Sequence, residues 1–159
     1  MKDKIVYSID TSALIDGLER FYPEKTFPGL WDKVVSLLED GRLIISEEAW
    51  DESRKKDLAT KEWCDKHDKD KWVVNTDASV AAEVRRILAL YPRIVGEMKG
   101  RNRADPFVIA VASLNNAVVV TGEGPDGNDR KPKIPYICSN MGIKSITFLQ
   151  LIKAEGWSF

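Results

Sequence analysis

The chain has 159 residues, of which 43% are hydrophobic and 31% are charged, with 5 Trp and 2 Cys. A chain of this length buries about 68–70% of its unfolded surface, so it needs neither disulfides nor a structural metal to hold a core. The two cysteines, Cys64 and Cys138, form no Cys-x-x-Cys pair, which argues against a secreted disulfide scaffold and against a zinc module. These features predict one globular domain over residues 1–159.

Charge and hydropathy indicate the compartment and the partners. No run approaches 18 consecutive apolar residues, and the N-terminus enters a strand pattern without a signal-peptide core, so we expect a cytoplasmic protein with no membrane partner. The net charge of -1 gives no general attraction to polyanions, so any nucleic-acid contact has to be local. Basic residues do form clusters, at 54–56, 85–86, 93–103 and 130–133. A solvated face explains any one of these clusters taken alone.

Short apolar runs alternate with helical patterns along the whole chain. Residues 4–9 predict a buried strand that feeds a helix beginning near Asp10. The next elements are a helix from Pro28 to about Gly41, a strand at 43–45, and a helix that Ser46 caps. The middle of the chain continues with a charged helical stretch at 60–67, a strand at 72–74, a helix capped by Thr76 or Asp77, and a stretch at 91–103 that is either helix or loop. An apolar helix from Asp105 to Asn115, a strand at 117–121 and a polar loop at 122–135 follow, and we expect the loop to border an active site. The last elements are a short helix ending at Gly142, a strand at 145–147 and a helix at 148–155.

The alternation of strands and helices predicts an α/β fold, a three-layer α/β/α sandwich with a mainly parallel central sheet. In such a fold the functional sites lie outside the carboxyl ends of the strands. The residues that follow each strand are therefore the first candidates for chemistry.

Acidic residues fall at that edge of the sheet. Asp10 follows the first strand, Glu52 lies in the helix after the second, Asp105 begins the apolar helix, and Glu123 follows the strand at 117–121. Such a set suits metal-assisted phosphodiester hydrolysis, because Mg²⁺ and Mn²⁺ take hard oxygen ligands. Without a metal, four neighbouring carboxylates would raise one another's pKa and destabilise the fold.

Each of these residues also has a simpler explanation. Asp10 and Asp105 stand where helix N-caps are expected, Glu52 fits an exposed helix face, and Glu123 fits a loop. The coincidence of acidic residues at three strand ends, beside otherwise apolar segments, favours a site over four separate explanations.

Four motifs resemble those of a known family. They are Ile-Asp-Thr-Ser-Ala-Leu-Ile at 9–15, Ile-Ser followed by Glu52 at 45–52, Asp-Pro-Phe-Val-Ile-Ala-Val-Ala at 105–112, and Val-Val-Thr-Gly-Glu at 119–123. Together they span nearly the whole chain, and the motif at 105–112 is the most specific. The sequence resembles PIN-domain ribonucleases of the VapC toxin type, and more narrowly a PIN-like subgroup formerly catalogued as a domain of unknown function.

The resemblance implies a Mg²⁺- or Mn²⁺-dependent endoribonuclease that acts on RNA, with single-stranded or loop RNA as the expected target. It implies that Asp10, Glu52, Asp105 and Glu123 bind the metal. It also implies that the metal ligands or a water molecule are oriented by a hydroxyl group, that of Thr11, Ser12 or Thr121. It further implies the toxin of a type II toxin–antitoxin pair, with an antitoxin protein as partner and a homodimer as the assembly.

The identity of the fourth carboxylate is open, because Glu123 stands where the family has Asp. Asp126 and Asp129, in the same loop, are the alternatives.

Two other functions compete with the nuclease. The first is a PIN-like fold that has lost catalysis and only binds RNA or protein. The second is a receiver-like phospho-acceptor domain, in which Asp10 would lie near Asp77, with Thr121 and Lys144 completing the site. A catalytic triad based on histidine is disfavoured, because His67 is the only histidine and stands among charges away from any strand end. The helical stretch that contains it is expected to present a solvated face.

Overall fold

Five parallel strands form the central sheet in the computed structural model, which describes residues 4–55, 58–67, 69–95 and 103–159. The strand order is β3-β2-β1-β4-β5, and every neighbouring pair is parallel. The bounds are β1 Tyr7–Ile9, β2 Leu43–Ser46, β3 Val73–Val74, β4 Val118–Val120 and β5 Ser145–Ile146. The prediction of a three-layer α/β/α sandwich is confirmed.

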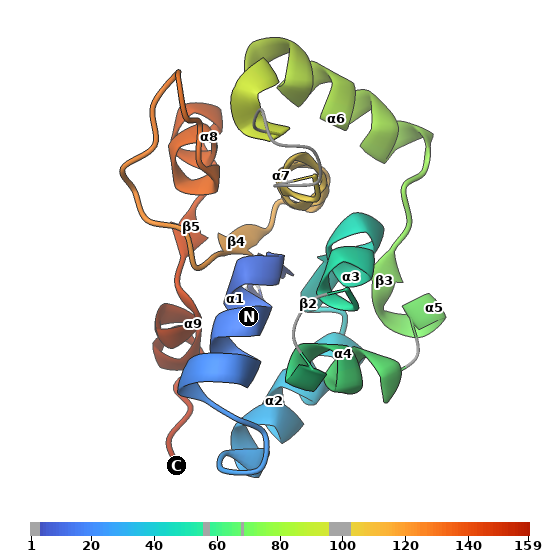
Figure 1. Cartoon of the computed structure of the whole chain (residues 1–159), viewed down its shortest axis with the longest axis vertical. Coiled ribbons are helices and arrows are strands. Elements are labelled where there is room, and N and C mark those ends of the chain that lie inside the picture. Colours follow the sequence, from blue (N-terminus) through green and yellow to red (C-terminus); the bar gives the residue numbers. More distant parts are fainter. Residues whose placement is uncertain (1–3, 56–57, 68, 96–102) are drawn as a thin grey trace.

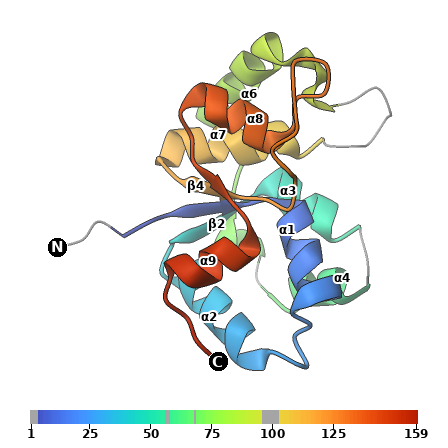
Figure 2. The same cartoon turned by 90° about the vertical axis from the view of Figure 1, so that its left-hand side faces the viewer.

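Helices cover both faces of the sheet (Figure 1 and Figure 2). One face carries α6 (Ala78–Leu90), α7 (Asp105–Asn115) and α8 (Ile134–Met141), and the other carries α2 (Pro28–Glu39) and α9 (Phe148–Ala154). The remaining helices in the described ranges are α1 (Thr11–Ile15), its π-helical continuation η1 (Asp16–Phe21), α3 (Glu47–Ser53), α4 (Leu58–Asp65), α5 (Lys69–Trp72) and the 3-10 turn η2 (Pro92–Val95). None of the helices described is long and apolar enough to cross a membrane.

Helix α7 is the centre of the core. It packs against β1, β2 and β4, and the residues from Val108 to Ala112 are all buried, as its unbroken apolar sequence predicts. A strand hydroxyl reaches it, because Ser8 Oγ donates a hydrogen bond of 3.0 Å to the Val108 carbonyl. The helix ends at Asn116, which adopts a left-handed conformation with φ 51°.

The undecided stretch at 91–103 is helical at its start, where η2 covers Pro92–Val95. Residues 96–102, which include the basic residues Lys99 and Arg101, lie outside the described ranges. The sequence placed Trp72 in a strand, but it ends α5, and β3 has only two residues.

The stretch around α4 differs most from the prediction. Trp63 and Cys64 are buried, so the helix does not present a solvated face there. The His67 ring lies between two indoles, with ring centroids 4.7 Å from Trp63 and 4.6 Å from Trp72. Trp63 also contacts Trp31, and this aromatic packing decides the burial of a helix whose sequence is mostly polar.

A buried ionic cluster ties the end of the chain to the amino-terminal edge of the sheet. Glu155 Oε2 accepts hydrogen bonds from Tyr7 Oη at 2.6 Å and Arg42 Nη2 at 2.7 Å. Burial raises the pKa of Glu155, but the bonds from Arg42 and Tyr7 outweigh burial and hold this pKa below its ordinary value. Arg42 also donates to the Ile5 carbonyl at 3.0 Å, so it joins three segments of the chain.

Arg42→Met should therefore destabilise the fold, because it leaves the Glu155 carboxylate partly buried and without its cation. We expect a loss of about 2–3 kcal/mol in the free energy of unfolding, measured by urea denaturation. Arg20→Met is the matched control, since Arg20 pairs with Asp16 and its side chain is 68% exposed, and it should change stability by less than about 1 kcal/mol. Equal losses in the two variants would contradict the role of the Arg42 cluster.

Candidate active site

The register of β1 and β4 brings the first two site residues together. Ile9 pairs with Val120, and Asp10 N donates to the Val120 carbonyl at 2.9 Å, so the next residues, Asp10 and Thr121, lie side by side. The strand order also reverses between β1 and β4, since β2 and β3 lie to one side and β5 to the other. This is the topological switch point, where open parallel sheets form their binding crevices.

Asp10 is buried and held by hydroxyl groups. Its Oδ2 accepts hydrogen bonds from Ser12 Oγ at 2.5 Å and Thr121 Oγ1 at 2.7 Å, and its Oδ1 accepts a longer bond of 3.3 Å from Ser12 N. Burial raises the pKa of Asp10, and the bonds from Ser12 and Thr121 offset only part of that effect. Asp10 also caps α1, so the cap explanation and the site explanation hold for the same residue.

Asp105 does not act as a helix cap. The N-cap position of α7 belongs to Ala104, and no side chain caps this helix, so the explanation of Asp105 as an N-cap is wrong. The residue is only 5% exposed. The pKa of Asp105 is raised to about 10, first by burial and then by the charges of the other three predicted ligands, Asp10, Glu123 and Glu52.

Glu123 is the loop carboxylate that reaches this group. It hydrogen bonds with Asp105, and its Oε2 accepts a bond of 2.8 Å from Ile134 N at the start of α8. Burial raises the pKa of Glu123, and the Ile134 amide offsets part of the shift. Asp126 is instead exposed and pairs with Lys133 at 2.8 Å, and Asp129 accepts from Tyr136 Oη at 2.5 Å. Of the three alternatives, Glu123 is the one that contacts Asp105.

Glu52 enters from the other side, on α3. Ser46 caps this helix, accepting a bond of 3.1 Å from Ala49 N, as its sequence predicts. Glu52 is half-buried, and its charge acts on Asp105. Thr11 donates to the Ala49 carbonyl at 3.3 Å, so its hydroxyl joins α1 to α3 and does not face a ligand.

Two residues beside the site, Asp16 and Cys138, were not predicted from the sequence. Asp16 stands one helical turn after Ser12, and its Oδ2 lies so close to Gly122 that any Cβ there would clash with it. Its signal was the i, i+4 spacing from Ser12 on one helix face. Cys138 is fully buried on α8, and its pKa is raised to about 12, first by burial and then by the charges of Asp10 and Glu123. Nothing in the sequence indicates this proximity.

The donor chemistry fits a divalent cation. Three buried or half-buried carboxyl groups, Asp10, Asp105 and Glu123, lie together, and no Lys or Arg in the described ranges forms an ion pair with any of them. Raised pKa values in all three mean that negative charge there is poorly compensated. Within the described residues, no group of three acidic, Cys or His side chains already stands at metal-binding spacing.

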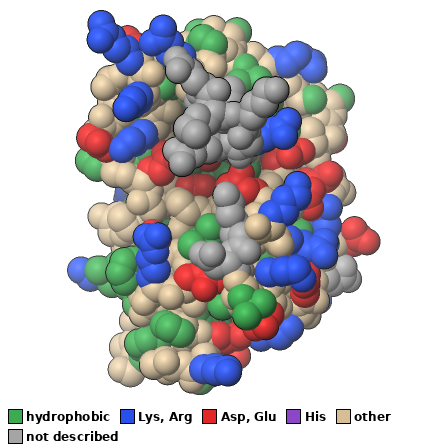
Figure 3. All heavy atoms as spheres, viewed as in Figure 1, with side chains coloured by type: hydrophobic (Ala, Val, Ile, Leu, Met, Phe, Trp, Pro, Cys, Tyr) green, Lys and Arg blue, Asp and Glu red, His purple; other side chains and the backbone are tan. Residues whose placement is uncertain are grey.

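The surface around the site is mixed in charge. Figure 3 looks onto the edge where the strands end, and Asp and Glu side chains run across its middle with Lys and Arg side chains on both sides. Basic residues that are exposed and form no ion pair with another residue of the described ranges include Arg85, Arg93, Arg103, Arg130 and Lys131. A polyanion could therefore contact cations on either side of the carboxylates.

The raised pKa of Asp105 predicts a pH dependence of stability in the metal-free protein. The folded state favours the protonated carboxyl, so this contribution is full below the ordinary pKa of 3.8 and is lost as the pH rises toward about 10. The free energy of unfolding should fall between pH 5 and pH 9. Asp105→Asn should flatten this dependence and be at least about 2 kcal/mol more stable than wild type at pH 8, in urea denaturation with a chelator. A wild-type stability that rises over this range would contradict the assignment.

Gly122→Ala should disturb the site, because Gly122 N donates to Ser12 Oγ at 2.9 Å and the new methyl group would collide with Asp16. We expect a loss of about 1–3 kcal/mol in stability. Gly124→Ala is the control, since its Cβ would meet one atom, Asp126 Oδ1 at 3.2 Å, whereas the Cβ at Gly122 would lie closer still to Asp16 Oδ2 and 3.2 Å from Ser12 Oγ. The control should change stability by less than about 1 kcal/mol. The same loss in both variants would show that the close approach at Gly122 is unimportant.

Comparison with known proteins gives a family and no function. No curated protein matches the chain. The profile of the family described as "Domain of unknown function (DUF4411)" matches residues 7–159, which include every element of the sheet and every carboxylate of the candidate site. The chain therefore belongs to the DUF4411 family.

Proposed function

We propose that this chain is a metal-dependent endoribonuclease that hydrolyses RNA phosphodiester bonds with Mg²⁺ or Mn²⁺. The observation that carries the proposal is the buried Asp105 carboxyl, enclosed by the charges of Asp10, Glu123 and Glu52. A fold tolerates such a group when the protein gains a charge partner at that place.

The four carboxylates would hold the cation, which would polarise the phosphate and lower the pKa of an attacking water. In the metal-free protein Asp105 keeps its proton at neutral pH and shares a hydrogen bond with Glu123. Metal binding would release that proton, because carboxylate ligands bind deprotonated.

The other residues of the site orient these carboxylates. The hydroxyls of Ser12 and Thr121 both donate to Asp10 Oδ2, while Oδ1 accepts a longer bond of 3.3 Å from Ser12 N. Thr121 Oγ1 also accepts from Glu123 N at 3.1 Å, so one hydroxyl positions two of the acidic residues. The Ile134 amide fixes Glu123 Oε2 in the same way. Such supporting contacts set the geometry of a metal site.

The family resemblance of the sequence extends the proposal beyond the site. The four acidic motifs resemble those of PIN-domain ribonucleases of the VapC type, with Glu123 in place of Asp in the last, and the acidic residues of all four act on the candidate site. On that basis we propose that the chain is the toxin of a type II toxin–antitoxin pair, bound by an antitoxin protein, and that it forms a homodimer. The exposed basic residues around the carboxylates would contact the RNA backbone.

Metal binding can be tested apart from cleavage. Mn²⁺ at 100 times its dissociation constant should stabilise the wild type by about 2.7 kcal/mol, seen as a rise in the unfolding temperature. Asp105→Asn and Asp10→Asn should lose most of this stabilisation. Asp126→Asn, with its exposed carboxylate in the same loop as Glu123, should keep it.

Cleavage of a mixed single-stranded RNA pool should follow the same pattern. Asp10→Asn, Asp105→Asn and Glu123→Gln should each lose at least about 100-fold in rate, while Asp126→Asn and Asp129→Asn remain near wild type. Undiminished cleavage by both Asp10→Asn and Asp105→Asn would refute the proposal. Loss of cleavage in Asp129→Asn but not in Glu123→Gln would assign the fourth ligand to Asp129.

The binding module remains the second candidate, and metal stabilisation without any RNA cleavage would favour it. The receiver-like alternative has no support in the geometry. Strand β2 separates β1 from β3, and the Asp77 side chain caps α6 by accepting from Val80 N at 2.9 Å. Receiver domains of the doubly wound type have the strand order 2-1-3-4-5, which differs from the order here.

A further inference from the structure

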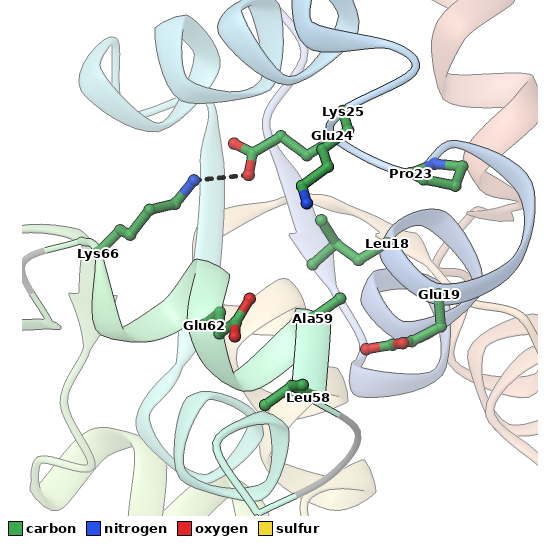
Figure 4. Close-up of a pocket in the computed structure, with 9 residues that line it drawn as sticks. All are labelled: Leu18, Glu19, Pro23, Glu24, Lys25, Leu58, Ala59, Glu62 and Lys66. Atoms are coloured by element: carbon green, nitrogen blue, oxygen red, sulfur yellow. Dashed lines mark hydrogen bonds and ion pairs between the residues drawn. The ribbon is translucent and has the colours of Figure 1, made fainter.

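A pocket of about 490 Å³ lies between η1, the loop at 23–25 and α4 (Figure 4). It shares no residue with the carboxylate site. Its apolar lining includes Leu18, which is buried, and Leu58, which is 70% exposed. The pocket therefore offers a ligand apolar surface beside its charged residues.

The charged residues of the pocket are unevenly distributed between its two ends. In Figure 4 the head groups of Lys25, Glu24 and Lys66 lie toward one end, where Lys66 Nζ donates to Glu24 Oε1 at 2.5 Å and joins α4 to the loop. The carboxylates of Glu19 and Glu62 lie toward the other end, on either side of Ala59. The pocket therefore has one end with an excess of negative charge.

Glu19 is fixed in place by the helix it faces. Its Oε1 accepts hydrogen bonds from Thr60 N at 2.7 Å and Thr60 Oγ1 at 3.0 Å. Neither bond uses Oε2, and no residue in the described ranges donates a hydrogen bond to this oxygen. A carboxylate that is already oriented loses little freedom when it binds a cation.

From this arrangement we infer that the pocket binds an arginine side chain within an apolar segment of a partner protein. The aliphatic stem would lie on Leu18 and Ala59, as long basic side chains do on apolar surface. The planar guanidinium would face Glu19 and Glu62, because its fork of donors matches carboxylate oxygens better than a lysine ammonium does. Apolar neighbours of the arginine would cover Leu58, and Lys25 would keep a second cation away from the opposite end.

The test uses the full chain, labelled with ¹⁵N, and the peptide acetyl-Ala-Leu-Arg-Leu-Ala-amide. Saturable shifts should appear at the amides of Glu19, Leu58 and Glu62 in NMR titrations. The same peptide with citrulline in place of arginine has the same shape without the charge, and it should bind about fivefold or more weakly. The affinity of the arginine peptide should also fall as salt is raised.

Glu62→Gln and Glu19→Gln separate the carboxylates from the apolar lining. Each should weaken the arginine peptide about threefold or more, and Glu19→Gln keeps a carbonyl oxygen that can accept from Thr60, so the fold is preserved. Glu39→Gln, at the exposed end of α2, is the matched control and should leave binding unchanged.

Three results would overturn the inference: equal affinity for the citrulline peptide, shifts confined to other surfaces, or the same amide shifts on raising the protein concentration alone. The last result would assign the pocket to a second copy of the chain. The outcome does not depend on nuclease activity, because no residue of the carboxylate site takes part.

Discussion

Burying several carboxyl groups in one small volume is the constraint on which the rest of the structure depends. Asp10, Asp105 and Glu123 come from separate parts of the sequence. Burial opposes the ionisation of each carboxyl group, and neighbouring negative charges oppose it further at Asp105 and Glu123. The protein offsets this cost with the hydroxyls of Ser12 and Thr121, one amide of α8, and a proton on Asp105. None of these partners is a cation, so the cost is reduced without being removed.

The same constraint explains the secondary structure around the site. A carboxyl group can stay buried at the first residue of α7 only if the helix itself is immobile, and the burial of Val108 to Ala112 between the sheet and α6 provides this. Gly122 lies closely against Ser12 and Asp16, and the Ile134 amide fixes the carboxylate of the next residue, Glu123. Core packing and site geometry are therefore not separable in this half of the molecule.

Sequence patterns predicted the fold and the placement of Asp10 and Thr121, because strand ends in a parallel sheet meet at one edge and their register follows from the pairing of neighbouring strands. They failed where tertiary contacts overrule local composition. The sequence of α4 is mostly polar and gives no sign that Trp63 packs against indoles from other elements. Asp105 fits a helix N-cap in the sequence, and only its neighbours in space show that it does not act as one. Cys138 gave no signal at all, since its position beside the carboxylates depends entirely on how α8 docks.

The helix that begins at Asp10 contains a π-helical stretch, Asp16–Phe21, directly after five α-helical residues. A π turn holds one residue more than an α turn, so the side chains that follow are rotated by about 100° from their α-helical directions. Ser12, before the widened turn, and Asp16, its first residue, lie beside Gly122, whereas Glu19 reaches across to Thr60 on α4. The continuous helix formed by α1 and η1 thus presents two chemically different faces, and the extra residue in its π-helical turn sets the angle between them.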